Sequence, residues 1–185
     1  MESPRFLVGQ FLLAMPGIGD PRFERSVIAI CAHDERGALG VGVGATVDGL
    51  GVHALLRQLD IDPGAAPDRP VHRGGPCEPQ RGFVLHSPDW GGQDSIDVAG
   101  RWSMTGTIDV LRAIAEGRGP GHWTVALGYA GWDAGQLDAE LLRHGWFSTA
   151  GDVDGLYDDT IDRWTAGFRA AGIDPRLLSV EAGTA

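Results

Sequence analysis

The residues best suited to chemistry in this chain gather in two glycine-rich stretches. The first begins with Gly74-Gly75-Pro76, continues through Arg81 and ends at His86. The guanidinium of Arg81 could hold an anion through two parallel hydrogen bonds. It could equally tie together backbone carbonyls or pair with Glu78, which is the more common use of an arginine. His86 ends an apolar run, where a structural imidazole is the commoner outcome.

The second stretch, residues 127–141, indicates a strand that turns sharply into a helix. Residues 124–127 have the composition of a buried strand, and the two glycines that flank Tyr129 would allow a tight turn after it. Asp133 and Gln136 have the spacing of a capping box at a helix N-terminus. This pattern predicts that the polar and aromatic side chains of the stretch lie at the turn.

If the two stretches meet in space, Arg81 and Trp132 border a common recess. A small-ligand groove is one interpretation of such a recess. The alternatives are that Trp132 belongs to the core, since tryptophan is usually largely buried, and that Asp133 is only a helix cap. The predicted ligand-binding residues are Gly74, Gly75, Arg81, His86, Tyr129, Trp132 and Gln136.

Two further groupings could carry catalysis or a metal. Cys77 with His72 or His86 could form a thiolate and its base, although the spacing matches no known protease signature and an inert thiol is the alternative. Cys31 and His33 are two residues apart on a predicted strand, so both would lie on one face. A metal needs more ligands than these two. We therefore predict no catalytic residues, no metal and no cofactor.

Net charge limits the possible partners. The chain has 185 residues and a formal charge of −10, so it would be repelled by nucleic acid and by anionic membrane surfaces. All 15 basic residues are arginine, which the codon usage of a GC-rich genome would explain. The sequence therefore predicts a small-molecule or protein partner, with direct nucleic-acid binding unlikely and the oligomeric state unknown.

Length and cysteine content indicate an ordinary globular protein. A chain of 185 residues fits a single domain, spanning residues 1–185, with a sizeable core. Its two cysteines do not make a disulfide scaffold. The N-terminus lacks the pattern of a signal peptide, and no apolar run is long enough for a membrane span. A soluble cytoplasmic protein is expected.

Local patterns predict an α+β fold with a bent, mixed or antiparallel sheet and about four helices packed against it. Gly40, Gly42 and Gly44 alternate with apolar residues, which does not match the spacing of a dinucleotide-binding loop and favours a strand crossed closely by another backbone. Strands are expected at residues 6–15, 26–31, 38–47, 82–86, 95–98, 124–127, 146–147 and 155–157. Helices are expected at residues 52–59 and 108–116, after Asp133, and after a cap at Thr160, with a long loop over residues 60–70.

Five segments also resemble the YqgE/AlgH family of bacterial proteins. They read FLLAMPGIGDPRF (11–23), SVIAICAH (26–33), GALG (37–40), GGPCEPQRGFVLH (74–86) and LGYAGWDAGQLDAEL (127–141). The resemblance spans nearly the whole chain and implies an α+β fold with a folded, partly split sheet. The family is chiefly uncharacterised, and its label as a transcriptional regulator of alginate production comes from association. The resemblance supplies no catalytic residues.

The chain departs from the family pattern at two places. Family members usually carry an Asn-x-Pro triplet where this sequence has Gly44-Ala45-Thr46, and an aliphatic residue where it has Cys77.

Three functional interpretations follow. The leading one is a non-enzymatic binding or regulatory domain, because polar and aromatic residues at glycine-rich turns carry the most specific patterns. An enzyme, for example a hydrolase that uses Cys77, His86 or Arg81, is the alternative. An oligomerising scaffold is the third, and it predicts an exposed apolar patch.

Overall fold

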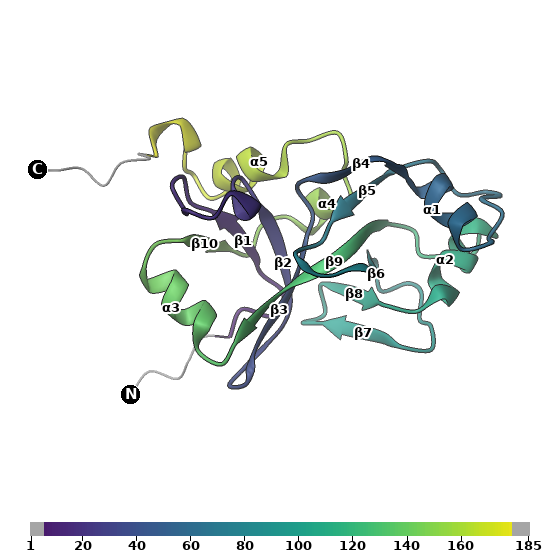
Figure 1. The fold of residues 1–185 in the computed structure, drawn as a ribbon, viewed down its shortest axis with the longest axis horizontal. Helices are drawn as coiled ribbons and strands as arrows, with labels where there is room; N and C mark the ends of the chain where they lie inside the picture. The colour runs from purple at the N-terminus through teal and green to yellow at the C-terminus, as the bar shows by residue number, and fades with distance from the viewer. Residues whose placement is uncertain (1–5, 179–185) are drawn as a thin grey trace, which may run out of the picture.

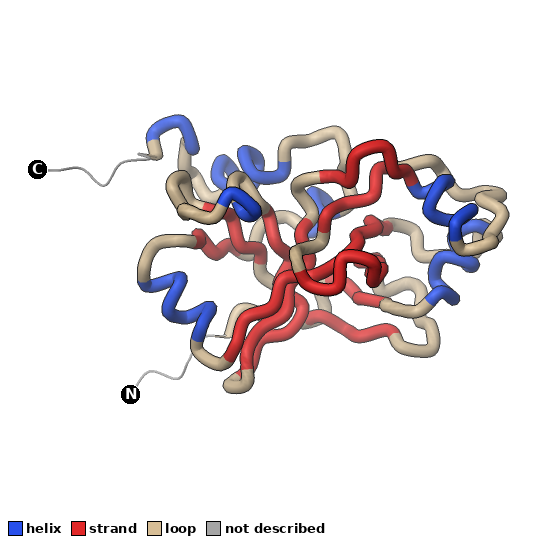
Figure 2. The backbone as a smooth tube through the Cα atoms, in the orientation of Figure 1, coloured by secondary structure: helices blue, strands red, loops and turns tan. Residues whose placement is uncertain are grey.

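Strand β9 (Trp123–Asp133) runs through the centre of the computed structural model, which describes residues 6–178 (Figure 1). Ten strands form one curled sheet, and the helices lie around its periphery (Figure 2). This arrangement confirms the predicted α+β class with a bent, mixed sheet, in which nearly all strand pairs are antiparallel.

The other elements follow in chain order. The remaining strands are β1 (Phe11–Ala14), β2 (Val27–Asp34), β3 (Gly37–Gly42), β4 (Thr46–Gly51), β5 (Pro70–Arg73), β6 (Cys77–His86), β7 (Ser95–Val98), β8 (Trp102–Thr105) and β10 (Trp146–Thr149). The helices are α1 (Val52–Gln58), α2 (Ile108–Ala115), α3 (Gln136–Leu142), α4 (Val153–Leu156) and α5 (Arg163–Ala170), with the 3-10 helices η1 (Pro21–Phe23) and η2 (Pro175–Leu177).

The sheet forks along one side of β9. The first half of β9 pairs in parallel with β5, from Val71 opposite Val125 to Arg73 opposite Leu127. Its second half pairs antiparallel with β3, while β6 lies along the other side of β9. Strands β3 and β5 therefore approach each other end to end, and the Gly42 N–H donates to the Gly74 carbonyl at 2.7 Å where they meet. We call this junction the fork.

Gly128 marks the place on β9 where the partner strand changes. Its φ of +81° belongs to the left-handed region that glycine adopts without a steric penalty. The two glycines near Tyr129 thus bend a continuous strand, and the predicted turn at this point is wrong. Asp133 remains in β9, and the N-cap of α3 is Gly135 rather than Asp133. The Gln136 side chain still accepts a hydrogen bond from the Asp133 N–H at 3.0 Å, as half of a capping box would.

Three apolar clusters hold the layers together. One lies between the sheet and α4 and α5, and includes Trp102, Trp164 and Phe168. A second lies beneath α1 and α2. The third lies between the sheet and α3, with Trp132 and Trp146 in it. Each cluster is thus covered by a different helix or pair of helices. Helices are needed on both faces of the curled sheet because both faces carry apolar side chains.

Several other predicted elements are wrong in extent or type. The strand expected over residues 38–47 is interrupted, since β3 ends at Gly42 and β4 begins at Thr46. The strand expected at residues 155–157 is replaced by α4, whose N-cap Asp152 accepts from the Asp154 N–H. The last helix is capped by Asp162 and not by Thr160, because the Asp162 carboxylate accepts the first free N–H groups of α5.

Other expectations are confirmed or extended. Helices α1 and α2 begin and end within a residue or two of the predicted bounds. Strand β6 begins at Cys77, earlier than expected, and β1 covers only part of the predicted apolar run. Within residues 6–178 no helix is long and apolar enough to cross a membrane.

Candidate functional site

The structure divides the predicted ligand-binding residues among four places. Trp132 and Gln136 anchor α3 to the sheet through Glu140. Trp132 and Trp146 both donate their indole N–H to Glu140 Oε2, at 2.8 and 2.9 Å. Gln136 Nε2 donates to the other carboxylate oxygen at 3.3 Å. Trp132 is 7% exposed, so these residues pack a helix, as the core alternative for Trp132 proposed.

Arg81 and Tyr129 lie at the surface around Glu78. The Arg81 guanidinium is 3.5 Å from the Glu78 carboxylate and 5.1 Å from the Phe83 ring centroid, and its side chain is 56% exposed. Glu78 also raises the pKa of Tyr129. Trp132 belongs to the cluster beneath α3, whereas Phe83 beside Arg81 belongs to the cluster on the α5 side, against which Tyr129 also packs. Arg81 and Trp132 therefore adjoin different apolar clusters.

His86 lies at the far end of β6 and is completely buried. Its Nδ1 lies 2.9 Å from the Ser87 carbonyl and its Nε2 2.7 Å from the Thr105 hydroxyl. A neutral imidazole that donates from Nδ1 and accepts at Nε2 satisfies both contacts. Burial lowers the pKa of His86, which favours this neutral form. The ring is therefore a structural element of the β6–β8 pair, as the sequence alternative held.

The proposed cysteine pairs do not form. Cys77 and His86 are at opposite ends of β6 and pair with Tyr129 and Trp123 of β9. At a rise of about 3.3 Å per residue along β9, the two are roughly 20 Å apart. Cys31 and His33 face different clusters because a bulge between Ile30 and Ala32 shifts the alternation of β2. Burial raises the pKa of the Cys31 thiol to about 12. Within residues 6–178 no three His, Cys, Asp or Glu side chains gather to hold a metal ion.

Gly74 and Gly75 do lie in a pocket, at the fork in the sheet. The pocket has a volume of about 510 Å³. Its walls come from four segments: the one around η1 and the start of β2, the β3–β4 connection, the β5–β6 connection, and β9. The residues that line it are Arg22, Phe23, Ser26, Val27, Ile28, Gly42, Gly44, Ala45, Val47, Arg73, Gly74, Gly75, Pro76, Pro79 and Leu127. We call it the fork pocket.

The fork pocket exists because glycines let three backbones approach closely. A Cβ on Gly42 would lie 2.5 Å from the Arg73 carbonyl oxygen, and one on Gly74 would lie 2.0 Å from the Gly128 carbonyl oxygen. Both distances are far below a van der Waals contact. The expectation that the glycine-containing strand is crossed closely by another backbone is thus confirmed.

Two arginines are the charged side chains of the fork pocket, and they differ in their partners. Arg22 is held by Asp20 through its Nε and Nη2, with the closest ion-pair distance at 2.8 Å. Arg73 donates its Nε to the Thr46 carbonyl at 3.1 Å. Among the described residues, no carboxylate lies within ion-pair distance of Arg73. Arg73 therefore carries the uncompensated positive charge of the pocket.

A half-buried carboxylate, Asp159, supports the fork pocket from behind. It accepts from Arg69 Nε at 2.7 Å, from His72 Nε2 at 3.1 Å and from Arg163 Nη2 at 3.0 Å. Burial alone would raise the pKa of Asp159, but these three donors outweigh it and hold the pKa well below its usual range. We call Asp159 with its three donors the carboxylate hub.

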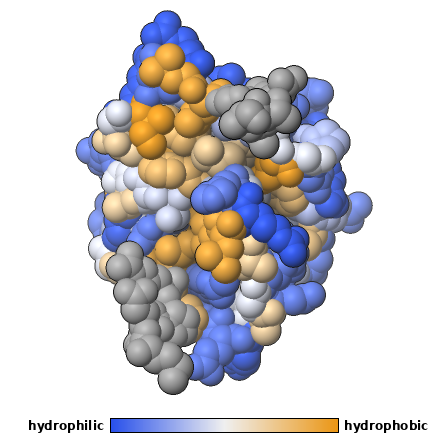
Figure 3. Space-filling model, turned by 90° about the vertical axis from the view of Figure 1, so that its left-hand side faces the viewer, coloured by the Kyte–Doolittle hydropathy of each residue, from blue (hydrophilic) through white to orange (hydrophobic). Residues whose placement is uncertain are grey.

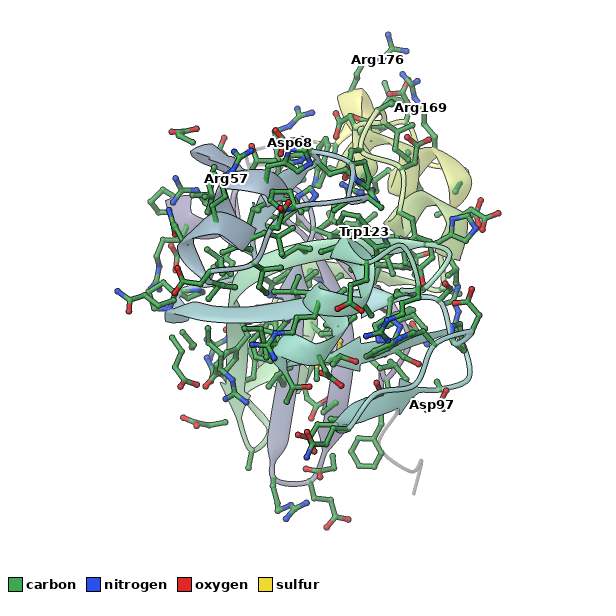
Figure 4. The ribbon with its side chains drawn as sticks, turned by 90° about the vertical axis from the view of Figure 1, so that its right-hand side faces the viewer. Arg57, Asp68, Asp97, Trp123, Arg169 and Arg176 are labelled. Atoms are coloured by element: carbon green, nitrogen blue, oxygen red, sulfur yellow. The ribbon has the colours of Figure 1, made fainter. Side chains whose placement is uncertain are left out.

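The hub reaches both walls of the pocket. Arg163 Nη1 donates to the Val43 carbonyl at 2.9 Å, next to the exposed Gly44-Ala45 wall. His72 directly precedes Arg73 on β5. Trp123, which is labelled in Figure 4, has its ring centroid 4.7 Å from the guanidinium carbon of Arg69. The C-terminal part of the chain therefore holds the pocket walls in place.

Sequence reasoning missed Arg22, Arg73 and the carboxylate hub. The walls of the fork pocket come from four segments. No residue spacing within a single segment predicts that these side chains meet. One signal was present in part, because the pocket joins four of the motif segments named above, residues 11–23, 26–33, 74–86 and 127–141. The Gly44-Ala45-Thr46 stretch, where the chain departs from the family pattern, forms another wall.

Comparison with known proteins agrees with this architecture. Residues 11–176 match the family model described as AlgH-like. The chain belongs to the AlgH-like family. It is 62% identical over 187 residues to a UPF0301 protein of Rhizorhabdus wittichii, with all of both chains covered. A UPF0301 protein of Ruegeria pomeroyi is 48% identical and covers 97% of this chain and 99% of its own.

Two solved structures have the same fold. The solution structure of the AlgH protein from Pseudomonas aeruginosa has a TM-score of 0.80 and 36% identity, and covers 100% of this chain and 99% of its own. A crystal structure of the protein DIP2367 from Corynebacterium diphtheriae, at 24% identity and a TM-score of 0.73, covers 92% of this chain and 90% of its own and supports the fold alone.

One face of this AlgH-like domain carries exposed apolar side chains. Figure 3 shows hydrophobic areas among hydrophilic ones on the side where α3 and η2 lie in Figure 1. Leu142 in α3 is 82% exposed and Leu177 in η2 is 83% exposed. These side chains are the kind of feature that the scaffold interpretation expects, although nothing on this face identifies an occupant.

Proposed function

We propose that this protein is a non-enzymatic ligand-binding domain whose ligand occupies the fork pocket. The observation that carries the proposal is the composition of the pocket walls. A volume of about 510 Å³ lies within the range of small-molecule sites, which are mostly apolar with a few convergent polar groups. The fork pocket has this character, with aliphatic, aromatic and proline side chains around two arginines.

The charged groups of the pocket favour binding over turnover. An arginine remains protonated at any physiological pH, so it donates hydrogen bonds but does not accept or release protons during a reaction. Arg22 and Arg73 are the titratable side chains among the lining residues. Ser26 has a hydroxyl, but no histidine or carboxylate among the lining residues would activate it. The pocket is thus equipped to hold a ligand.

The geometry does not support the simplest enzyme alternative, a hydrolase that uses Cys77 with His86. A hydrolase that used Cys77 with His86 would need both groups within hydrogen-bond reach of one another. They are separated by nearly the length of β6, and His86 has no exposed surface. Any regulatory role is proposed to act through the bound ligand or a protein partner. The net charge of −10 disfavours direct contact with DNA.

A ligand screen by thermal unfolding tests the proposal, because a ligand that binds the native state raises its melting temperature. Ala45 lies exposed on the pocket wall, so Ala45→Trp should fill the pocket and leave the core intact. Ala134→Trp, in the exposed turn before α3, is the matched control. We expect metabolites that stabilise the wild type to stabilise the control equally and to lose their effect on Ala45→Trp. Ligands that stabilise all three proteins alike would place the binding site elsewhere.

A further inference from the structure

We propose that the fork pocket selects small monocarboxylates with an apolar body, and that Arg73 binds the carboxylate. This inference rests on the proposed function and names the chemical class of its ligand. It begins from the unequal positions of the two arginines. Arg22 is already neutralised by a two-point contact with Asp20, whereas Arg73 is fixed only through Nε. The two terminal nitrogens of Arg73 can therefore donate two hydrogen bonds to a ligand carboxylate.

A single uncompensated cation suits a single negative charge. A phosphate with close to two charges would need a second cation, and Arg22 could supply it only by giving up Asp20. The rest of the protein opposes anions, because the chain carries a net charge of −10. A monoanion suffers less from this field than a dianion does. The charge balance thus favours a carboxylate over a phosphate.

Backbone groups beside Arg73 can add further donors. Gly44 and Ala45 are exposed, and among the described residues neither backbone N–H donates a hydrogen bond to another protein group. Both residues line the same pocket as Arg73. Main-chain N–H groups next to a guanidinium are a common way to bind an anion's second oxygen.

The remaining walls require an apolar body on the ligand. Phe23, Val47 and Leu127 face the pocket together with Pro76 and Pro79. Burial of apolar surface against such side chains supplies affinity that the charge contact, partly exposed to water, does not. Acetate could pair with Arg73, but it would leave the apolar walls exposed to water. A larger aliphatic or aromatic acid could pair with Arg73 and also cover the apolar walls.

Isothermal titration calorimetry of the full chain with defined probes tests the ligand class. The probes are hexanoate and 3-phenylpropionate, with 3-phenylpropanamide as the uncharged analogue, acetate as the acid without a body, and inorganic phosphate as the dianion. We expect the two larger acids to bind, and the amide, acetate and phosphate to bind at least about tenfold more weakly. Equal binding of the acid and its amide would overturn the role of the carboxylate. Equal binding of phosphate would overturn the charge selectivity.

Variants of Arg73 test the residue. Arg73→Gln should lower the affinity for the two larger acids about tenfold or more. Arg73→Lys should lower it less, because lysine keeps the charge but not the bidentate geometry. Arg36→Gln is the matched control, because Arg36 lies on the β2–β3 hairpin with a side chain that is 92% exposed. An equal loss in Arg36→Gln would mean that only net charge matters, which contradicts the proposal. If Arg73→Gln fails to fold, the affinities of 3-phenylpropionate and 3-phenylpropanamide are compared on the wild type and on Arg73→Lys. A preference for the acid that is smaller in Arg73→Lys supports the role of Arg73, and an unchanged preference overturns it.

Failure of this inference can be told apart from failure of the proposed function. If the acids do not bind but another compound stabilises the wild type and loses its effect on Ala45→Trp, the ligand class is wrong and the binding function stands. If no compound in the broad screen stabilises the wild type, both are wrong.

Discussion

Gly74 illustrates how a single missing side chain shapes this protein. Its backbone lies against the Gly128 carbonyl, and Gly128 in turn bends β9 where its partner strand changes. The sequence predicts two uses for its glycines, conformational freedom at turns and close approach of two backbones. At Gly74 what matters is space, because the β5–β6 connection crosses β9 at backbone contact distance.

We predict that Gly74→Ala destabilises the fold by roughly 1–3 kcal/mol, the usual cost of forcing atoms into a packed interior. The added Cβ would lie 2.0 Å from a backbone oxygen, which cannot rotate away as a flexible side chain could. Gly91→Ala is the control, since nothing lies within 4 Å of its Cβ and its φ is not positive. Chemical denaturation of both variants gives the comparison, and equal stabilities would contradict the close approach.

The side-chain contacts of this protein were predictable only where the two partners are close in sequence. Glu78 and Arg81 are three residues apart, and the sequence already offered their pairing as an alternative. The Trp132 indole pairs with Glu140 eight residues away, across a strand-to-helix connection. Burial of Trp132 could be expected from its size, but its partner could not. The contact between Arg163 and the Val43 carbonyl spans 120 residues, and no local pattern carries such information.

Helices and strands, too, were predictable where they depend on local sequence and were missed where they depend on distant partners. Helix α2 was predictable because Val110, Leu111 and Ile114 repeat at helical spacing and Asp109 lies in the first turn. Strands β5 and β8 and most of β4 were not predicted, because each is short and one of its partner strands is distant in sequence or irregular in register. The glycines of β9 were read as a turn since a turn and a close backbone crossing demand the same residue. Only the tertiary contacts separate the two cases.

The carboxylate hub joins α4 and α5 to the sheet, and we predict that Asp159→Asn lowers stability by about 3 kcal/mol. The amide would leave Arg69 and Arg163 without their buried negative partner, and the Asp159 side chain is only 17% exposed. Asp48→Asn, which removes an exposed carboxylate from β4, is the matched control. Urea denaturation at neutral pH measures both. A loss for Asp159→Asn no larger than that of the control would show that the hub contributes little.

The same carboxylate should give the fold a distinct acid sensitivity. The pKa of Asp159 is lowered in the folded protein, so the unfolded chain takes up a proton at this residue first as pH falls. Stability from Asp159 is therefore complete above about pH 4, the pKa of an unfolded aspartate, and is lost below it. We expect the stability difference between wild type and Asp159→Asn to shrink as pH falls below 4. A difference that stays constant in denaturation curves from pH 6 to pH 3 would contradict this assignment.

The sheet as a whole was anticipated better than its site. A curled, partly split α+β sheet followed from the spread of strands along the chain and from the family resemblance, and the fork is where the split occurs. The fork pocket itself depends on the relative placement of four segments. Of the predicted ligand-binding residues, Gly74 and Gly75 line the fork pocket, whereas Arg81, Trp132 and His86 lie elsewhere in the molecule. A role of any of them in ligand binding stays a prediction.

Net charge sets one further expectation for the whole protein. With a formal charge of −10, it should show no binding to duplex DNA at concentrations up to about 10 µM, because phosphate contacts by basic residues provide most non-specific affinity. Fluorescence anisotropy of a labelled duplex at low salt measures this, with a basic DNA-binding protein as the positive control. Salt-sensitive binding at micromolar concentrations would contradict the prediction.

The link from Arg163 to the Val43 carbonyl has a consequence for the protein's synthesis. The β3–β4 wall emerges from the ribosome early, but the residues that brace it, Asp159 and Arg163, emerge some 120 residues later. A nascent chain that ends before Asp159 lacks the brace behind the fork pocket. The β3–β4 wall can therefore be held in its final place only after Asp159 and Arg163 have been synthesised.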